Sequence, residues 1–105
     1  MRVLEFKVDK QSLKQDPNCD FTKIVAGSKN YLKAHFTFSD GWADYKKAVS
    51  FWRGKEEYAF LLEDDTCMIP EEVLVGRTFA VSILGMKDDI TVPTNRVFVI
   101  QEVFN

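Results

Sequence analysis

The chain has 105 residues, of which 46% are hydrophobic and 29% charged, and its formal net charge is -2. This composition predicts one globular domain with a single core. Because phosphate binding requires an excess of clustered Lys and Arg, the slight acidity excludes a typical nucleic-acid partner. No apolar stretch approaches the roughly 18 residues of a membrane span, and no apolar region follows Met1. We therefore expect no membrane partner and no signal peptide.

Short runs of alternating apolar and polar residues predict half-buried strands. The most regular run spans 31–38, and we interpret it as a central strand with Phe36 and Phe38 facing inward. The other runs with strand character are 4–8, 47–53, 57–62, 67–69, 78–84, 90–92 and 97–104.

The residues between these runs are typical of turns. Gly54 and Lys55 predict a hairpin between the runs 47–53 and 57–62. Pro70, followed by two acidic residues, predicts one short helix near 70–74, since negative charge is favourable in the first turn. Gly85 and the charged residues after it predict the end of the strand 78–84. About seven strands with one short helix predict an antiparallel, immunoglobulin-like β-sandwich over residues 1–105.

The two cysteines, Cys19 and Cys67, lie far apart in the sequence, and neither has a Cys or His at the spacing of metal ligands. We expect free thiols in a reducing compartment, with Cys67 mostly buried. A disulfide stays open as an alternative, because pairing depends on the separation of the two Cα atoms.

The residue types needed for catalysis or metal binding do not occur in a suitable pattern. His35 is the only histidine, and it lies on the polar face of its strand with no cysteine near it in the sequence. The acidic residues 63–65 lack the alternating ligands, glycine and distal Glu of an EF-hand loop, so we interpret them as a solvated hairpin tip. We expect no enzyme activity, no metal and no cofactor.

Aromatic side chains are the best candidates for binding, because their rings stack on sugars and anchor protein interfaces. Trp42 has two interpretations, a binding platform or a plug at one end of the sandwich, and we favour the plug. Trp52 lies on the opposite face of its strand from Phe51 and is a possible interface residue. The last run carries few charges and favours self-association through an unpaired edge or its outer face; its candidate interface residues are Phe98, Ile100 and Phe104.

Several short segments then follow one another in a characteristic order: 28–31 (SKNY), 36–42 (FTFSDGW), 48–51 (AVSF), 61–74 (LLEDDTCMIPEEVL), 81–85 (VSILG) and 93–95 (PTN). In this order they resemble the N-terminal β-sandwich domain of phage and prophage baseplate, tail-fibre or minor structural proteins of Gram-positive hosts. The resemblance covers about residues 30–99. The structural residues of the shared motifs are Phe36, Phe38, Trp42, Phe51 and Pro70.

This chain departs from the family pattern at two places. Family members often have Trp at the position of Glu71 and a Gly-Leu pair at Ala43 and Asp44, so a shared binding surface does not follow. They also commonly continue into a coiled coil or fibre, whereas this chain stops at Asn105. We expect either a fragment of a longer fibre protein or a stand-alone short version.

The resemblance implies a non-catalytic virion module, attached to tail, baseplate, fibre or capsid, whose partners are other virion proteins and copies of itself. Its expected location is the host cytoplasm during assembly and then the virion. One alternative is a small phage-encoded inhibitor of a host protein, which the short, acidic chain also fits. Another is a carbohydrate-binding module that uses Trp52 with Tyr58 or Tyr31.

Overall fold

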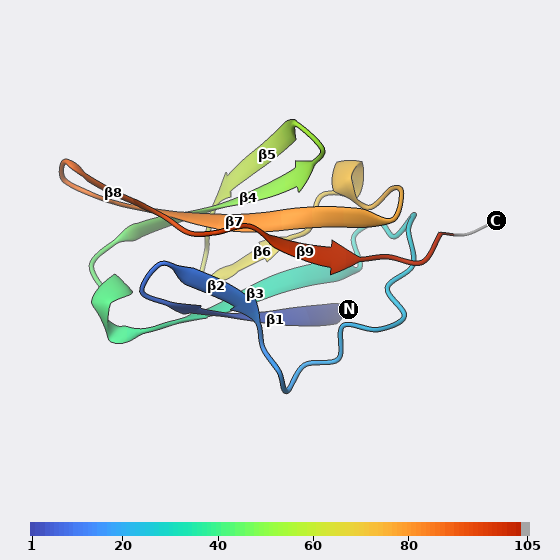
Figure 1. Cartoon of the computed structure of the whole chain (residues 1–105), viewed down its shortest axis with the longest axis horizontal. Helices are drawn as coiled ribbons and strands as arrows, with labels where there is room; N and C mark the ends of the chain where they lie inside the picture. Colours follow the sequence, from blue (N-terminus) through green and yellow to red (C-terminus); the bar gives the residue numbers. More distant parts are fainter. Residues whose placement is uncertain (104–105) are drawn as a thin grey trace.

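Two β-sheets packed face to face make up the fold in the computed structural model, which describes residues 1–103 (Figure 1). The first sheet has the order β2-β1-β3-β6, with β1 at Arg2–Asp9, β2 at Ser12–Gln15, β3 at Leu32–Phe38 and β6 at Thr66–Met68. The second has the order β5-β4-β7-β8, with β9 also paired to β7; its strands are β4 Lys46–Arg53, β5 Glu56–Leu61, β7 Thr78–Lys87, β8 Ile90–Pro93 and β9 Val97–Ile100. The predicted β-sandwich is confirmed.

The strand pairing differs from the expectation in two respects. The described residues form nine strands rather than about seven, and the strand that was not among the expected runs is β2, which forms a hairpin with β1. In addition, β1 and β3 are parallel, from the pair Arg2 and Leu32 to the pair Val8 and Phe38. Alternation in a sequence indicates which side chains are buried but not the direction of the neighbouring strand. As predicted, β3 is a central strand, with β1 on one side and β6 on the other.

Three element boundaries also require correction. The short helix expected near 70–74 is a single 3-10 turn, η2 (Glu71–Val73), which Pro70 precedes as the N-cap residue. Gly85 does not end its strand, because β7 continues to Lys87. The last strand, expected to reach residue 104, ends at Ile100 in β9, and Phe104 lies outside the described residues.

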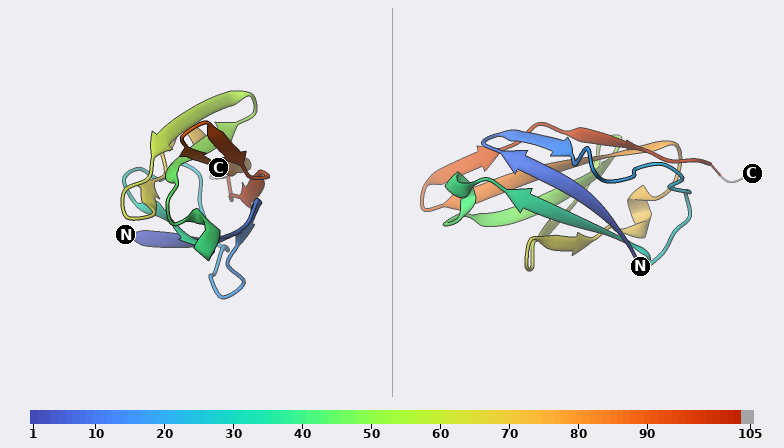
Figure 2. Two further views of the ribbon diagram at one scale, coloured as in Figure 1. Left: turned by 90° about the vertical axis from the view of Figure 1, so that its left-hand side faces the viewer. Right: turned by 90° about the horizontal axis from the view of Figure 1, so that it is seen from below.

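The core lies between the sheets and is contributed by alternate residues of both. Phe6 and Phe36 of the first sheet are fully buried, as are Phe51 and Phe79 of the second. The rings of Phe6 and Phe36 stack with centroids 5.2 Å apart. Each such side chain contributes about 1.5 to 3 kcal/mol through the apolar surface that it removes from water. Two single-turn 3-10 helices, η1 (Asp40–Trp42) and η2, lie at opposite ends of the sandwich (Figure 2).

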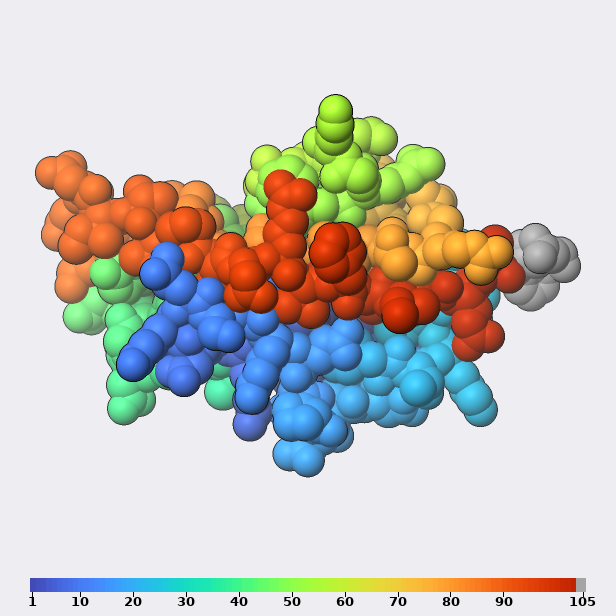
Figure 3. Space-filling model, viewed as in Figure 1, coloured from blue at the N-terminus to red at the C-terminus, as the bar shows by residue number. Residues whose placement is uncertain are grey.

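One long side of the sandwich is closed by amide side chains. Asn95 accepts a hydrogen bond from the Leu13 backbone N–H at 2.7 Å and donates one to the Leu13 carbonyl at 3.0 Å. Gln15 donates to the Phe98 carbonyl at 3.2 Å. These amide side chains form hydrogen bonds with backbone groups that would otherwise be free to pair with another strand. The edges of β2 and β9 are therefore protected on this side. Figure 3 shows the red β9 segment directly beside the blue N-terminal residues.

Candidate functional site

The outer face of the second sheet carries large apolar side chains exposed to solvent. Because Val49, Phe51, Val81 and Val99 point into the core, the residues between them on each strand point outward. We define the outer face by the outward side chains of β5, β4, β7 and β9, of which the largest are Leu61, Trp52, Phe98 and Ile100. The exposed fractions of Leu61, Phe98 and Ile100 are 60%, 63% and 73%.

Trp52 is held flat against this face by two neighbours. Its indole N–H donates a hydrogen bond to the Ser82 hydroxyl oxygen on β7, at 2.9 Å. The Arg96 guanidinium lies over the ring, with its Cζ 3.5 Å from the ring centroid. An arginine in this position attracts the ring with about 0.5 to 1 kcal/mol at an exposed site. Trp52 is therefore half-buried and fixed in one orientation.

The outer face has few charges, which include Lys46 at the start of β4, Glu57 and Arg96. Glu57 is on β5, where its carboxylate accepts a hydrogen bond from the Ser50 hydroxyl at 2.5 Å. Arg96 precedes β9, and its guanidinium lies over the Trp52 ring. Between them lie small or apolar side chains, among them Ala48, Ala80 and Leu84. A surface with aromatic and Arg side chains at its centre and few other charges is typical of the buried part of a protein interface.

The structure brings three of the predicted interface residues together. Trp52 and Phe98 lie in one register row, with Ala80 between them, and Ile100 follows Phe98 on the same side of β9. Phe104, the fourth, is outside the described residues. The sequence reasoning missed Leu61 and Arg96. Alternation in the run 57–62 places Leu61 on the same face as Glu57, so the sequence pattern could have identified Leu61. The stacking of Arg96 on Trp52 could not be predicted in this way, because it depends on the pairing of strands that are distant in the sequence.

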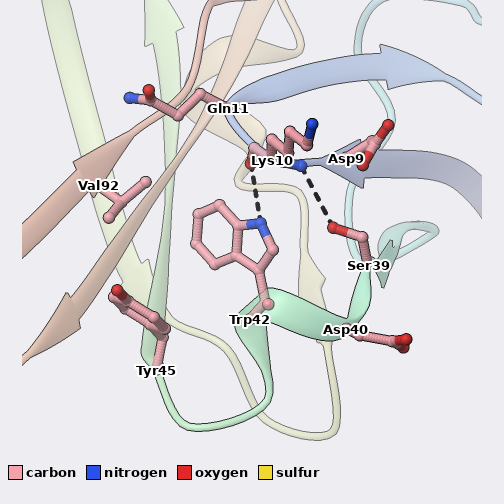
Figure 4. Close-up of a pocket in the computed structure, with 9 residues that line it drawn as sticks. Asp9, Lys10, Gln11, Ser39, Asp40, Trp42, Tyr45 and Val92 are labelled. Carbon is pink, nitrogen blue, oxygen red and sulfur yellow. Dashed lines mark hydrogen bonds between the residues drawn. The ribbon is translucent and has the colours of Figure 1, made fainter.

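Trp42 is the last residue of η1, at the end of the sandwich (Figure 4). Its exposed fraction is only 4%, and its indole N–H donates to the Lys10 carbonyl at 2.8 Å. The ring centroids of Phe38 and Tyr45 are 5.3 and 5.8 Å away. The plug interpretation of Trp42 is confirmed.

An open pocket of about 510 Å³ lies beside this plug, lined by Asp9, Lys10, Gln11, Ser39, Asp40, Gly41, Trp42, Tyr45 and Val92. Its size is in the range of small-molecule sites. Because the Trp42 ring is almost fully covered by the protein, the pocket offers a ligand mainly the side chain of Tyr45 as an aromatic surface.

The aromatic residues proposed for carbohydrate binding do not share a surface. Tyr58 pairs with the buried Phe51 and so points to the inner side of β5, whereas Trp52 points outward. Tyr31 precedes β3, in the other sheet. In addition, Arg96 already covers one side of the Trp52 ring.

The polar groups that we considered for catalysis or metal binding make local contacts within the fold. His35 is half-buried and bonds through Nδ1 to the Glu5 carboxylate of the adjacent strand, at 2.5 Å. Residues 63–66 form the predicted hairpin tip, in which Thr66 N–H donates to the Glu63 carbonyl at 3.0 Å. Within residues 1–103, no group of three or more His, Cys, Asp or Glu side chains is arranged to hold a metal ion. No helix of this part of the chain is long and apolar enough to cross a membrane.

Both cysteines are free, and each is half-buried, so Cys67 is less buried than expected. Burial raises the pKa of the Cys67 thiol, and the nearby Glu63 carboxylate raises the pKa further. A raised pKa lowers the fraction of thiolate, which is the reactive form, near neutral pH.

We therefore expect Cys67 to react slowly with a disulfide reagent in the folded protein and faster in the unfolded chain. The rate would be measured at pH 7.5 on a Cys19→Ser variant, with and without denaturant. The unsubstituted chain should titrate as two thiols after unfolding. Equal rates in the two states would contradict the effect of burial, and no thiols after unfolding would mean a disulfide.

No family model matches the chain, and a search of curated proteins gives no significant match.

Proposed function

We propose that the chain is a non-catalytic structural module of a phage virion, which binds other virion proteins through the outer face of its second sheet. The exposure of Phe98 and Ile100 on that face, beside Trp52, is the observation that carries the proposal. A soluble monomer gains nothing from exposing such side chains together, and exposed apolar patches commonly mark interaction sites.

The orientation of Trp52 supports the same proposal. Its hydrogen bond to Ser82 and the stacked Arg96 hold the ring in place before a partner arrives. A side chain that is already ordered loses little conformational entropy on binding. A small module with fixed side chains suits an assembly in which many copies must present the same surface.

The assignment to a virion rests on the resemblance in motif order. The same resemblance implies a location in the host cytoplasm during assembly and then in the virion. The component, whether tail, baseplate, fibre or capsid, is left open by that resemblance. A phage-encoded inhibitor of a host protein would use an exposed apolar face in the same way. The two hypotheses differ in where the chain is found.

Mass spectrometry of purified virions from the phage or prophage that encodes the chain tests this proposal. We expect its peptides in the virion, at a fixed ratio to a known structural protein. Phe98→Lys should reduce the copies per virion several-fold, because a charge would be buried in the interface. The control is Tyr31→Lys, which places the same charge at a half-exposed aromatic position just before β3 of the first sheet. Absence of the unsubstituted chain from virions, with co-purification of a host protein, would favour the inhibitor.

A further inference from the structure

The Arg96 side chain crosses the middle of the outer face. Arg96 directly precedes β9, whose first residue, Val97, pairs with Val81 of β7. Its guanidinium nevertheless lies over the ring of Trp52 on β4, which pairs with the other side of β7 (Figure 1). The side chain therefore passes over β7, and its charge lies over the middle of the sheet and not at its margin.

The guanidinium of Arg96 is held in place but has no anionic partner. Its Cζ is 3.5 Å from the Trp52 ring centroid, which is van der Waals contact, so one flat face of the group rests on the indole. The N–H donors lie in the plane of a guanidinium, and stacking leaves them free. None of the four ion pairs among residues 1–103 includes Arg96. Glu57, the acidic residue of the outer face, accepts a hydrogen bond from Ser50 and forms no ion pair with Arg96.

Apolar side chains lie on both sides of this charge. Phe98 and Ile100 follow Arg96 at alternate positions, point to the same face, and are 63% and 73% exposed. Toward the opposite end of the strands, Leu84 and Leu61 point outward in one row of the sheet. A partner that covers these apolar side chains therefore also covers the guanidinium between them.

Covering Arg96 without neutralising it would oppose binding. An unpaired charge that is removed from water costs several kcal/mol, comparable to what the apolar contacts contribute. The cost is offset when the partner provides an anion that also accepts hydrogen bonds from the guanidinium. The position of Arg96 thus sets a chemical requirement on whatever binds this face.

We propose that Arg96 and Trp52 form a carboxylate-binding site, and that the partner of the outer face places an Asp or Glu side chain there with apolar side chains beside it. The inference rests on the proposed function, since it takes the outer face as the interface. A guanidinium binds a carboxylate through two parallel N–H···O bonds. Because stacking on Trp52 already fixes the plane of the Arg96 guanidinium, little conformational entropy is lost on binding.

The single charge of the site favours a carboxylate over a phosphate. A phosphate monoester carries about -1.5 to -2 charges at pH 7 and is typically bound by a cluster of cations. The other cation among the outward side chains of the described strands β4, β5, β7 and β9 is Lys46, the first residue of β4. Lys46 and Trp52 are separated by six positions of an extended strand, roughly 20 Å. One carboxylate carries the charge that Arg96 alone can neutralise.

The test is an NMR titration of the isotope-labelled full chain with three probes that share one alkyl chain: sodium hexanoate, hexanamide and hexyl phosphate. We expect hexanoate at pH 7 to shift the Arg96 Nε–H and Trp52 Nε1–H resonances to saturation. Hexanamide, which has a similar size but no charge, should bind about fivefold more weakly, as the loss of one exposed ion pair predicts. Hexyl phosphate should bind no more tightly than hexanoate.

Three arginine variants identify the group that binds the carboxylate. Arg96→Gln should remove the preference for hexanoate over hexanamide. Arg96→Lys should keep a weaker preference, because an ammonium group keeps the charge without the planar pair of donors. The matched control is Arg53→Gln, which removes an exposed arginine next to Trp52 in the sequence and should leave the preference unchanged.

The same variants connect the site to the proposed interface. Arg96→Gln should lower the copies per virion several-fold, as Phe98→Lys does, whereas Arg53→Gln should not. Unchanged incorporation of Arg96→Gln, in virions from which Phe98→Lys is lost, would show that the partner supplies no carboxylate.

Two further outcomes of the titration would overturn the carboxylate site: equal binding of hexanoate and hexanamide, and a preference for hexanoate that persists in Arg96→Gln. Binding of hexyl phosphate about tenfold more tightly than hexanoate would contradict the choice of a carboxylate. Each of these results leaves the proposed function standing as long as Phe98→Lys lowers the copies per virion. Absence of the chain from virions would instead overturn the proposed function, while the titration decides the site independently.

Discussion

Replacing Trp42 by alanine is expected to lower the free energy of unfolding by about 3 to 5 kcal/mol, the range for loss of a large buried aromatic side chain. The ring is 4% exposed and packs between Phe38, Tyr45 and Gly85. Its removal leaves a cavity at the end of the sandwich and takes the hydrogen-bond donor from the Lys10 carbonyl. Both losses act in the same direction.

A urea titration with two-state analysis measures this effect. Tyr31→Ala is the matched control, because it removes an aromatic side chain that is half-exposed and should change stability by no more than about 0.5 kcal/mol. A loss below about 1 kcal/mol for Trp42→Ala would show that the ring does not contribute to the core. Trp42 would then return as a candidate for ligand binding in the adjacent pocket.

Gly85→Ala is expected to destabilise the protein by about 1 to 3 kcal/mol, although it adds only one methyl group. A Cβ atom on Gly85 would lie 2.5 Å from Cζ3 of Trp42, closer than two carbon atoms can approach. The indole cannot move away freely, since its N–H is bonded to the Lys10 carbonyl and its faces contact other rings. Either the ring or strand β7 must shift.

A double-mutant cycle with Trp42→Ala isolates this clash. In the Trp42→Ala background the space is free, so Gly85→Ala should cost little or even stabilise by restricting the unfolded chain. Gly41→Ala serves as the control, because a Cβ there would meet nothing within 4 Å. An equal cost of Gly85→Ala in both backgrounds would mean that the effect comes from the strand and not from Trp42.

Gly85 also illustrates how one residue can be misread from sequence. Followed by charged residues, it was expected to end a strand, yet β7 continues through it to Lys87. A glycine inside a strand often marks the close approach of another group. Here that group is Trp42, which lies more than forty positions earlier in the chain, and no local pattern connects the two residues.

The sequence by itself determined which side chains enter the core. Alternation placed Phe36 and Phe51 inside and Trp52 outside, because successive side chains of a strand point to opposite faces. Local turn chemistry located the hairpin after Arg53 and the polar tip near Asp64. Both kinds of information are contained within a few consecutive residues.

Only the tertiary structure decided which strands are neighbours. The parallel pairing of β1 with β3, the closure of one side by Asn95 and the stacking of Arg96 on Trp52 each join residues far apart in the chain. The physical reason is that alternation specifies the face on which a side chain lies, whereas the neighbour across the sheet depends on how the whole chain closes its core.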